Sequence, residues 1–157
     1  MATDAADTSA TTTTSNAPTS PLRVLIIDSH PAVGLGLTRL VSIMPGVEVC
    51  GLAVRGEDGL KCADLTPPDV ALVDAEQPND AGLDTIRRLR DGLPMTRVIA
   101  LGLYTARRTA ALAAGAHAFA LKDAGFDALR AAIVAEPSES SNVDRDLASA
   151  QMPRSAS

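Results

Sequence analysis

The sequence predicts an α/β fold, a doubly wound (βα)5 sandwich in which five parallel strands form one sheet between two layers of helices. Short apolar runs rich in β-branched residues alternate five times with longer segments of helical period, as in repeated βα units. Hydrophobic residues make up 46% of the 157 residues and aromatic residues only 2%, so the core must consist mainly of Ala, Val, Leu and Ile. The composition favours closely packed layers, and the length favours a single domain.

The strand predictions rest on runs of Val, Ile and Leu that are too short for helices. The first, third and fourth runs are apolar throughout, as expected of central parallel strands that helices cover on both faces. We therefore predict strands at residues 23–27, 47–51, 70–73, 98–101 and 118–121.

A segment with helical spacing of apolar residues follows each predicted strand. Pro31 suits the first turn of the first helix, where no backbone N–H donor is needed. The buried stripe of this helix is expected to comprise Leu35, Leu37, Leu40, Val41 and Met44. We predict helices at residues 32–44, 57–65, 83–91, 106–114 and 126–134.

Charged side chains follow several predicted strands at their carboxyl ends, where an open parallel sheet places its functional groups. Asp28 follows the first strand, Asp74 and Glu76 follow the third, and Lys122 follows the fifth. Carboxylates close together repel one another unless a hard cation such as Mg²⁺, which prefers oxygen ligands, lies between them. A neighbouring lysine adds a positive charge suited to a phosphoryl oxygen. The sequence therefore predicts a site in which a carboxylate accepts a phosphoryl group.

The order of these residues resembles the receiver domain of bacterial two-component response regulators, particularly its NarL/LuxR-type branch. The likeness extends through residues 22–135 and implies the flavodoxin-like form of the doubly wound fold. It is carried by residues 23–31 (RVLIIDSHP), 68–74 (PDVALVD), Pro78, Gly82-Leu83, 97–101 (RVIAL) and 114–123 (AGAHAFALKD).

The resemblance implies a role for each matching position. Asp74 corresponds to the phosphoacceptor, Asp28 to one of the acidic residues that organise Mg²⁺, and Lys122 to the lysine that pairs with the phosphoryl group. Phe119 falls where such domains place an aromatic whose inward rotation accompanies activation, although a plain core aromatic is the alternative interpretation. A signalling role is implied, and no enzymatic one.

Two positions depart from the family pattern. Most receivers carry two adjacent acids after the first strand, and the second, a direct metal ligand, is Ser29 here. A hydroxyl is a poorer Mg²⁺ ligand than a carboxylate, although Glu76 could restore part of the lost charge if it is not simply a solvated loop residue. The family's hydroxyl residue at the end of the fourth strand becomes Gly102 when counted forward, or Ala100 when counted backward. We therefore expect weakened Mg²⁺ binding and weak or dispensable phosphorylation at Asp74.

Arginines gather on the third and fourth predicted helices. A solvated helix face is one interpretation. The other gives Arg107 and Arg108 a place on an interaction face, because receivers commonly present their fourth and fifth helices to a partner or to a second copy. This face would be flattened by Ala110, Ala111, Ala113 and Ala114. The expected partner is a histidine kinase or a downstream regulator, with a homodimer through the same helices as a further expectation.

The net charge of −5 argues against direct nucleic-acid binding, which needs clustered Lys and Arg. No stretch approaches the ~20 apolar residues of a membrane-spanning helix. Residues 1–21 are rich in Thr and Ser and predict a disordered tail, and residues 136–157 predict either a second disordered tail or a truncated linker.

The cysteines and histidines offer no obvious chemistry in the sequence. Cys50 and Cys62 are too few for a disulfide framework and are expected to pack inside the fold, which favours a cytoplasmic setting. His30 and His117 are expected to lie outside any cluster of metal ligands.

Two functions fit the site residues. The first is an atypical receiver that acts in two-component-type signal transduction through protein–protein interaction. The alternative is a conventional receiver of a transcriptional regulator whose helix-turn-helix output domain is missing, because residues 136–157 are too few to form one. A small flavodoxin-like enzyme or ligand-binding protein is a third hypothesis, but the sequence offers neither a paired nucleophile and base nor a phosphate-binding loop.

Overall fold

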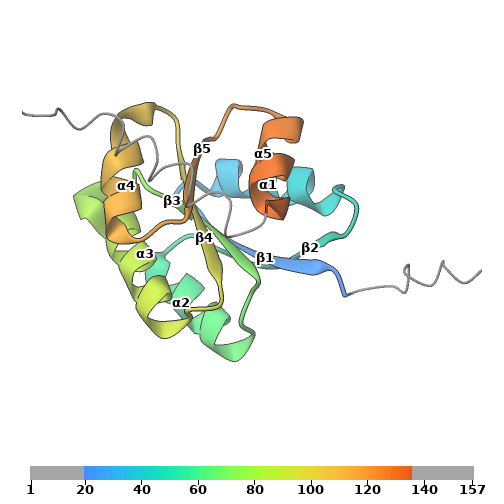
Figure 1. The fold of residues 1–157 in the computed structure, drawn as a ribbon, viewed down its shortest axis with the longest axis horizontal. Coiled ribbons are helices and arrows are strands. Elements are labelled where there is room, and N and C mark those ends of the chain that lie inside the picture. The colour runs from blue at the N-terminus through green and yellow to red at the C-terminus, as the bar shows by residue number, and fades with distance from the viewer. Residues whose placement is uncertain (1–19, 136–157) are drawn as a thin grey trace, which may run out of the picture.

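Five parallel strands form one sheet in the order β2-β1-β3-β4-β5 in the computed structural model, which describes residues 20–135. The chain adds β2 on one side of β1 and then returns to place β3 on the other, so its connections cover both faces of the sheet (Figure 1). This topology confirms the predicted (βα)5 fold. The strands are β1 (Leu22–Ile27), β2 (Val47–Ala53), β3 (Val70–Asp74), β4 (Arg97–Gly102) and β5 (Ala118–Leu121).

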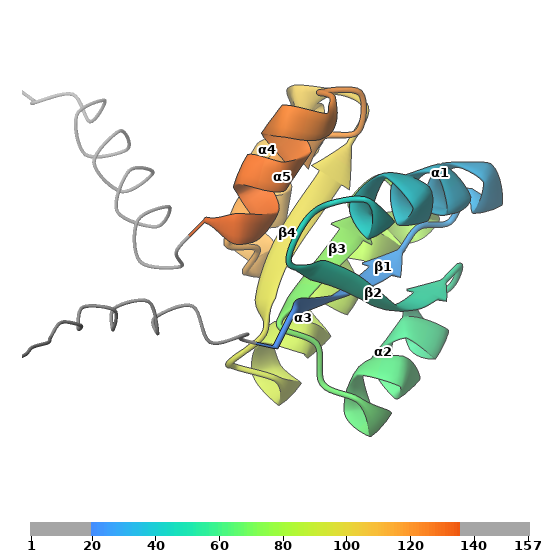
Figure 2. The ribbon, with the colours of Figure 1, turned by 90° about the vertical axis from the view of Figure 1, so that its right-hand side faces the viewer.

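The two core layers place α1 and α5 on one face of the sheet and α2, α3 and α4 on the other. Figure 2 shows α1 above strands β1 and β2 and α2 below them. The helices are α1 (Pro31–Ser42), α2 (Gly56–Leu65), α3 (Ala81–Gly92), α4 (Arg108–Ala114) and α5 (Phe126–Val134). Single 3₁₀ turns, η2 (Pro78–Asp80) and η3 (Thr105–Arg107), precede α3 and α4. The fourth helix therefore begins two residues later than predicted.

Alternation of side chains along the central strands divides the core into two layers. In β1, Val24 and Ile26 pack with α1 and α5, whereas Leu25 and Ile27 pack on the face of α2, α3 and α4. All four side chains are at most 1% exposed. Because strands buried on both faces need apolar residues at every position, the continuous Val, Leu and Ile runs identified them correctly.

The predicted stripe of α1 is wrong at one position. Leu37, Val41 and Met44 are buried, but Leu35 is 52% exposed. A residue two positions before Leu37 lies roughly 200° around the helix and therefore faces away from the sheet. The remaining member, Leu40, is partly buried at the edge of the same layer.

The start of α3 lies very close to the end of β3. A Cβ atom on Gly82 would lie 2.1 Å from the backbone oxygen of Asp74, so only glycine allows this approach. Asn79 and Asp80, just before the helix, adopt left-handed backbone angles, with φ of 59° and 57°. Together these features turn the chain sharply from β3 into α3 and fix the backbone around Asp74.

The terminal tail predictions concern residues 1–19 and 136–157, which lie outside the described residues. Among the helices of residues 20–135, none is long and apolar enough to cross a membrane.

Candidate phosphoacceptor site

Two buried carboxylates meet at the carboxyl edge of the sheet. Asp74 ends β3, and Asp28 directly follows β1, the strand that pairs with β3. The two residues are 0% and 1% exposed. Because neighbouring parallel strands end at the same edge, the fold places these two carboxylates together as the sequence predicted.

Lys122 lies between the two carboxylates. Its Nζ atom is 2.8 Å from Asp28 Oδ2 and 3.2 Å from Asp74 Oδ1, and its side chain is only 5% exposed. The lysine follows β5, and its backbone N–H donates a 2.8 Å hydrogen bond to the carbonyl oxygen of Gly102. This bond ties the base of the lysine to the end of β4 and directs the ammonium group into the site.

Ser29 takes part in the site through its hydroxyl group. Ser29 Oγ donates a 2.8 Å hydrogen bond to Asp74 Oδ2, and the backbone N–H of Glu76 donates to Asp74 Oδ1 at 2.9 Å. Both oxygens of Asp74 therefore have donors from the chain itself. A second carboxylate at position 29 would instead face Asp74 with like charge.

The ionised form of Asp74 is favoured despite burial. Burial acts to raise the pKa of Asp74, but the Glu76 backbone N–H, the Ser29 hydroxyl and the Lys122 ammonium group outweigh it and hold the pKa below its ordinary value. Asp74 is consequently an anion at neutral pH. An ionised carboxylate beside an ammonium group is the arrangement needed for a carboxylate that accepts a phosphoryl group.

His30 joins the two aspartates in a cluster that the sequence analysis missed. One ligand atom from each of Asp28, His30 and Asp74 lies within 4.8 Å of the others, and His30 Nδ1 is 3.6 Å from Asp28 Oδ1. The expectation that His30 lies outside any ligand cluster is therefore wrong. The signal was its position two residues after Asp28, where its N–H donates to Asp28 Oδ1 at 2.9 Å.

The donor atoms of this cluster fit a divalent cation. Two carboxylates supply the oxygen ligands that Mg²⁺ prefers, as the resemblance to receiver domains implies. Asp28 and Asp74 would hold the ion. To leave Asp74 Oδ2 open to the cation, the Ser29 hydroxyl would have to turn its proton away.

Glu76 is directed to the other side of the site. Its Oε2 atom accepts a hydrogen bond from the backbone N–H of Leu103, just after β4. In this arrangement its carboxylate stands apart from the cluster formed by Asp28, His30 and Asp74. The metal role of Glu76 stays a prediction that would require its side chain to turn.

Gly102 is the last residue of β4 and pairs with Leu121 of β5, whereas Ala100 is 0% exposed within the strand. Of the two counts made from the sequence, only the forward one reaches the end of the strand. The ring of Phe119 lies against this glycine, because a Cβ atom there would be 2.8 Å from Phe119 Cζ. Phe119 is half-buried and packs on the core layer of α2, α3 and α4.

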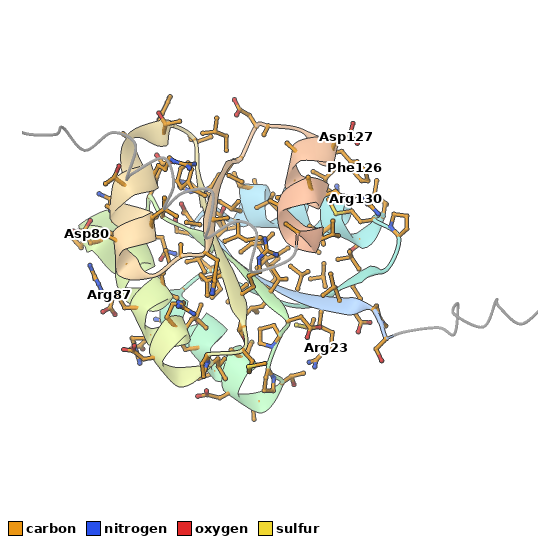
Figure 3. The ribbon with its side chains drawn as sticks, in the orientation of Figure 1. Arg23, Asp80, Arg87, Phe126, Asp127 and Arg130 are labelled. Atoms are coloured by element: carbon orange, nitrogen blue, oxygen red, sulfur yellow. The ribbon has the colours of Figure 1, made fainter. Side chains whose placement is uncertain are left out.

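The two arginines of the expected interaction face have different surroundings. Arg107 Nε donates to the carbonyl oxygen of Ala75 at 3.2 Å, and its guanidinium group also pairs with Asp80. Figure 3 shows Asp80 on the side of the molecule formed by α3 and α4. Arg108 is exposed at the start of α4. Arg107 therefore links the segment after β4 to the segment after β3.

The flat alanine face predicted for α4 is only partly present. Ala111 and Ala114 are 0% and 8% exposed and pack in the core, so they are not available to a partner. Ala113 is exposed. The larger apolar side chains at this end of the molecule are Leu103, 49% exposed, and Tyr104, 70% exposed.

Comparisons with known proteins agree with the geometry. The family model described as the response regulator receiver domain matches residues 24–134. The transcriptional regulatory protein MctR of Rhizobium johnstonii is 34% identical over 114 residues, which are 71% of this chain and 53% of MctR. The nitrate/nitrite response regulator protein NarL of Escherichia coli is 33% identical over 66% of this chain and 49% of NarL. The chain thus spans about half the length of these curated relatives.

Solved structures show the same architecture. One of them is the signal receiver domain of the putative response regulator NarL from Mycobacterium tuberculosis. It superposes with a TM-score of 0.68 at 30% identity, and the match covers 74% of this chain and 95% of that one. The flavodoxin-like fold and the NarL/LuxR-type resemblance are thereby confirmed. With its paired aspartates, its lysine and the matching model over residues 24–134, the chain belongs to the response regulator receiver domain family.

Proposed function

We propose that this chain is an atypical receiver that works in two-component signal transduction mainly through protein–protein interaction, with weak or dispensable phosphorylation at Asp74. The observation that carries the proposal is the 2.8 Å hydrogen bond from Ser29 Oγ to Asp74 Oδ2. In this position a hydroxyl group donates a hydrogen bond to the acceptor carboxylate, where most receivers offer a negative charge to a metal ion.

The charge balance of the site supports the proposal. Asp28 and Asp74 carry two negative charges, and Lys122 is within 3.2 Å of both. With Ser29 neutral, a divalent cation meets one net negative charge from these side chains. Affinity for hard cations rises with the number of charged ligands, so we expect weak Mg²⁺ binding.

Gly102 adds a second reason. A hydroxyl side chain at the end of β4 would offer a hydrogen bond to a phosphoryl group on Asp74, and glycine offers none. A phosphorylated Asp74 would therefore find one donor fewer for its phosphoryl oxygens. The partner that we expect is a histidine kinase or a downstream regulator, contacted near the exposed Tyr104 and Arg108.

A conventional phosphorylation switch within a transcriptional regulator is the second candidate. It is favoured by the match to MctR and NarL over about half of their length, since their names describe response and transcriptional regulation. The Asp28, Asp74 and Lys122 side chains that this function needs are all present in the site.

Beryllofluoride with Mg²⁺, a stable mimic of a phosphoryl group, separates the two candidates. Backbone amide spectra of the full chain should show small, unsaturated shifts at Ser29 and Phe119, whereas a Ser29→Asp variant should show larger, saturable ones. Saturable shifts in the unaltered chain at concentrations that also saturate Ser29→Asp would support the conventional switch and overturn the atypical one.

A further inference from the structure

The segment that follows β4 is attached to the segment that follows β3 at two points. The carboxylate of Glu76 accepts a hydrogen bond from the backbone N–H of Leu103, the first residue after β4. Arg107, in the turn before α4, returns to the carbonyl oxygen of Ala75. These contacts hold the β4–α4 segment against the residues that directly follow Asp74.

The Leu103 amide is a backbone donor just beyond the end of β4, the strand that pairs with the phosphoacceptor strand. Asp74 pairs with Leu101 across β3 and β4, and Leu103 is the first residue beyond the end of β4. Other donors at this edge already contact Asp74: the Glu76 N–H and Lys122 Nζ at Oδ1, and the Ser29 hydroxyl at Oδ2. An anion attached to Asp74 could draw the segment inward through the Leu103 N–H, but the Glu76 carboxylate already accepts from that group.

Gly102 makes this arrangement sterically feasible. A Cβ atom on Gly102 would lie 2.9 Å from Glu76 Oε2 and 2.8 Å from Phe119 Cζ, closer than carbon atoms normally approach. A serine or threonine would therefore have to displace both the carboxylate and the ring. The absence of a side chain at position 102 thus leaves the space that the Glu76 carboxylate occupies.

We propose that Glu76 acts as a built-in anion that holds the β4–α4 segment in one position by binding the Leu103 amide. The segment then presents the exposed Leu103 and Tyr104 side chains in the same way whether or not Asp74 is modified. This inference rests on the proposed function and deepens it, because it names the contact that would separate the interaction surface from the chemistry at Asp74.

Amide hydrogen exchange of the full chain, without Mg²⁺ or any phosphoryl mimic, tests the contact directly. Glu76→Ala should accelerate exchange of the Leu103 amide about tenfold or more, as expected when a hydrogen bond to a charged group is lost. Glu76→Gln keeps an oxygen acceptor and should retain part of the protection. Glu48→Ala, which removes an exposed glutamate on β2, is the matched control and should leave Leu103 unchanged.

Unchanged exchange at Leu103 in Glu76→Ala would overturn the inference, as would acceleration spread evenly over β4 and α4, which indicates general destabilisation. Beryllofluoride with Mg²⁺ is then added to the same variants. The inference requires the Leu103 amide to respond more in Glu76→Ala than in the unaltered chain. If the proposed function is wrong, beryllofluoride should instead give saturable shifts at Ser29 in the unaltered chain. That result comes from the Ser29 amide and is therefore distinguishable from the result at the Leu103 amide.

Discussion

The two edges of the sheet both bury polar side chains, but they satisfy them differently. At the amino edge, Arg97 is 5% exposed, and its Nη1 atom donates a 3.0 Å hydrogen bond to the carbonyl oxygen of Ile133 at the end of α5. At the carboxyl edge, the partners of Asp28 and Asp74 include the side chains of Lys122 and Ser29. A backbone carbonyl in a helix cannot leave its place, whereas a side chain can turn away and admit a cation.

This difference indicates at which edge of the sheet side-chain contacts can be exchanged for a bound ion. The amino edge also contains Thr96, whose Oγ1 donates to the carbonyl oxygen of Pro68 at 2.7 Å, and His117, whose Nδ1 accepts from the N–H of Val98 at 2.9 Å. Each of these hydrogen bonds links a side chain to a backbone group of a neighbouring segment and so stabilises the fold. The carboxyl edge has exchangeable partners, so of these two edges it is the one at which an added cation should change the stability of the protein.

The largest effect is expected at the amino edge. Arg97→Ala removes the donors to the Ile133 and Ala132 carbonyl oxygens and leaves a cavity, so the free energy of unfolding should fall by about 3 kcal/mol in urea titrations. Mg²⁺ should not restore it. The control Arg88→Ala removes an exposed arginine on α3 and should cost less than about 0.5 kcal/mol. A similar loss of unfolding free energy in Arg97→Ala and Arg88→Ala would contradict the stabilising role of the buried arginine at the amino edge.

Lys122→Met should have the next largest effect, and it should depend on solution conditions. Loss of the ammonium group removes its hydrogen bonds to the carboxylates of Asp28 and Asp74, at a cost of about 2 kcal/mol at pH 7. Added Mg²⁺ should recover part of this stability because a cation can replace the lysine.

Lowering the pH should also reduce the difference in the free energy of unfolding between Lys122→Met and the unaltered chain. The lowered pKa of Asp74 contributes stability that is present above its unfolded pKa of about 3.9 and is lost as pH falls through the folded value. Part of that contribution is already absent in Lys122→Met. Lys61→Met, on the exposed surface of α2, is the control. A deficit independent of both Mg²⁺ and pH would contradict an exchangeable site.

Gly102→Ala should destabilise the protein by about 1–2 kcal/mol, because the new methyl group would press on Phe119 and Glu76. In a double-mutant cycle, the cost should be smaller when Glu76 is already alanine, since one of the two obstructing groups is gone. Additive costs would show that Glu76 does not occupy the space beside Gly102.

The smallest effect is a pH dependence at the amino edge. Burial, and then the charges of Arg90 and Arg97, lower the pKa of His117. The unfolded chain, with a histidine pKa of about 6.5, therefore binds more protons than the folded one as pH falls below that value, so stability should decrease. In thermal unfolding experiments, His117→Gln should reduce the dependence of Tm on pH between pH 7.5 and pH 5.5. An unchanged slope would exclude His117 as its source.

The sequence was sufficient for the sheet and for the central site residues. Apolar strands covered on both faces have a pattern that shows directly in the chain, and the topology then brings Asp28, Asp74 and Lys122 to one edge. Leu35 was predicted wrongly because its spacing is only approximately helical, and a stripe must follow the 3.6-residue period closely to face the sheet.

The remaining features depend on tertiary contacts that leave no local pattern. The role of Arg97 depends on where α5 ends, 36 residues further along the chain. The direction of Glu76 depends on the space left by Gly102, and His30 reaches the aspartates only because the turn into α1 orients it. A lone glycine or histidine in the sequence does not specify such a neighbour.

Mg²⁺ binding to the full chain, compared with Ser29→Asp by calorimetry or amide shifts, tests the central claim most directly. Because Ser29 stands where most receivers have a metal-binding carboxylate, Ser29→Asp should bind Mg²⁺ at least about tenfold more tightly than the unaltered chain. Equal affinity of the two proteins for Mg²⁺ would show that the serine has not weakened the site and would contradict the account.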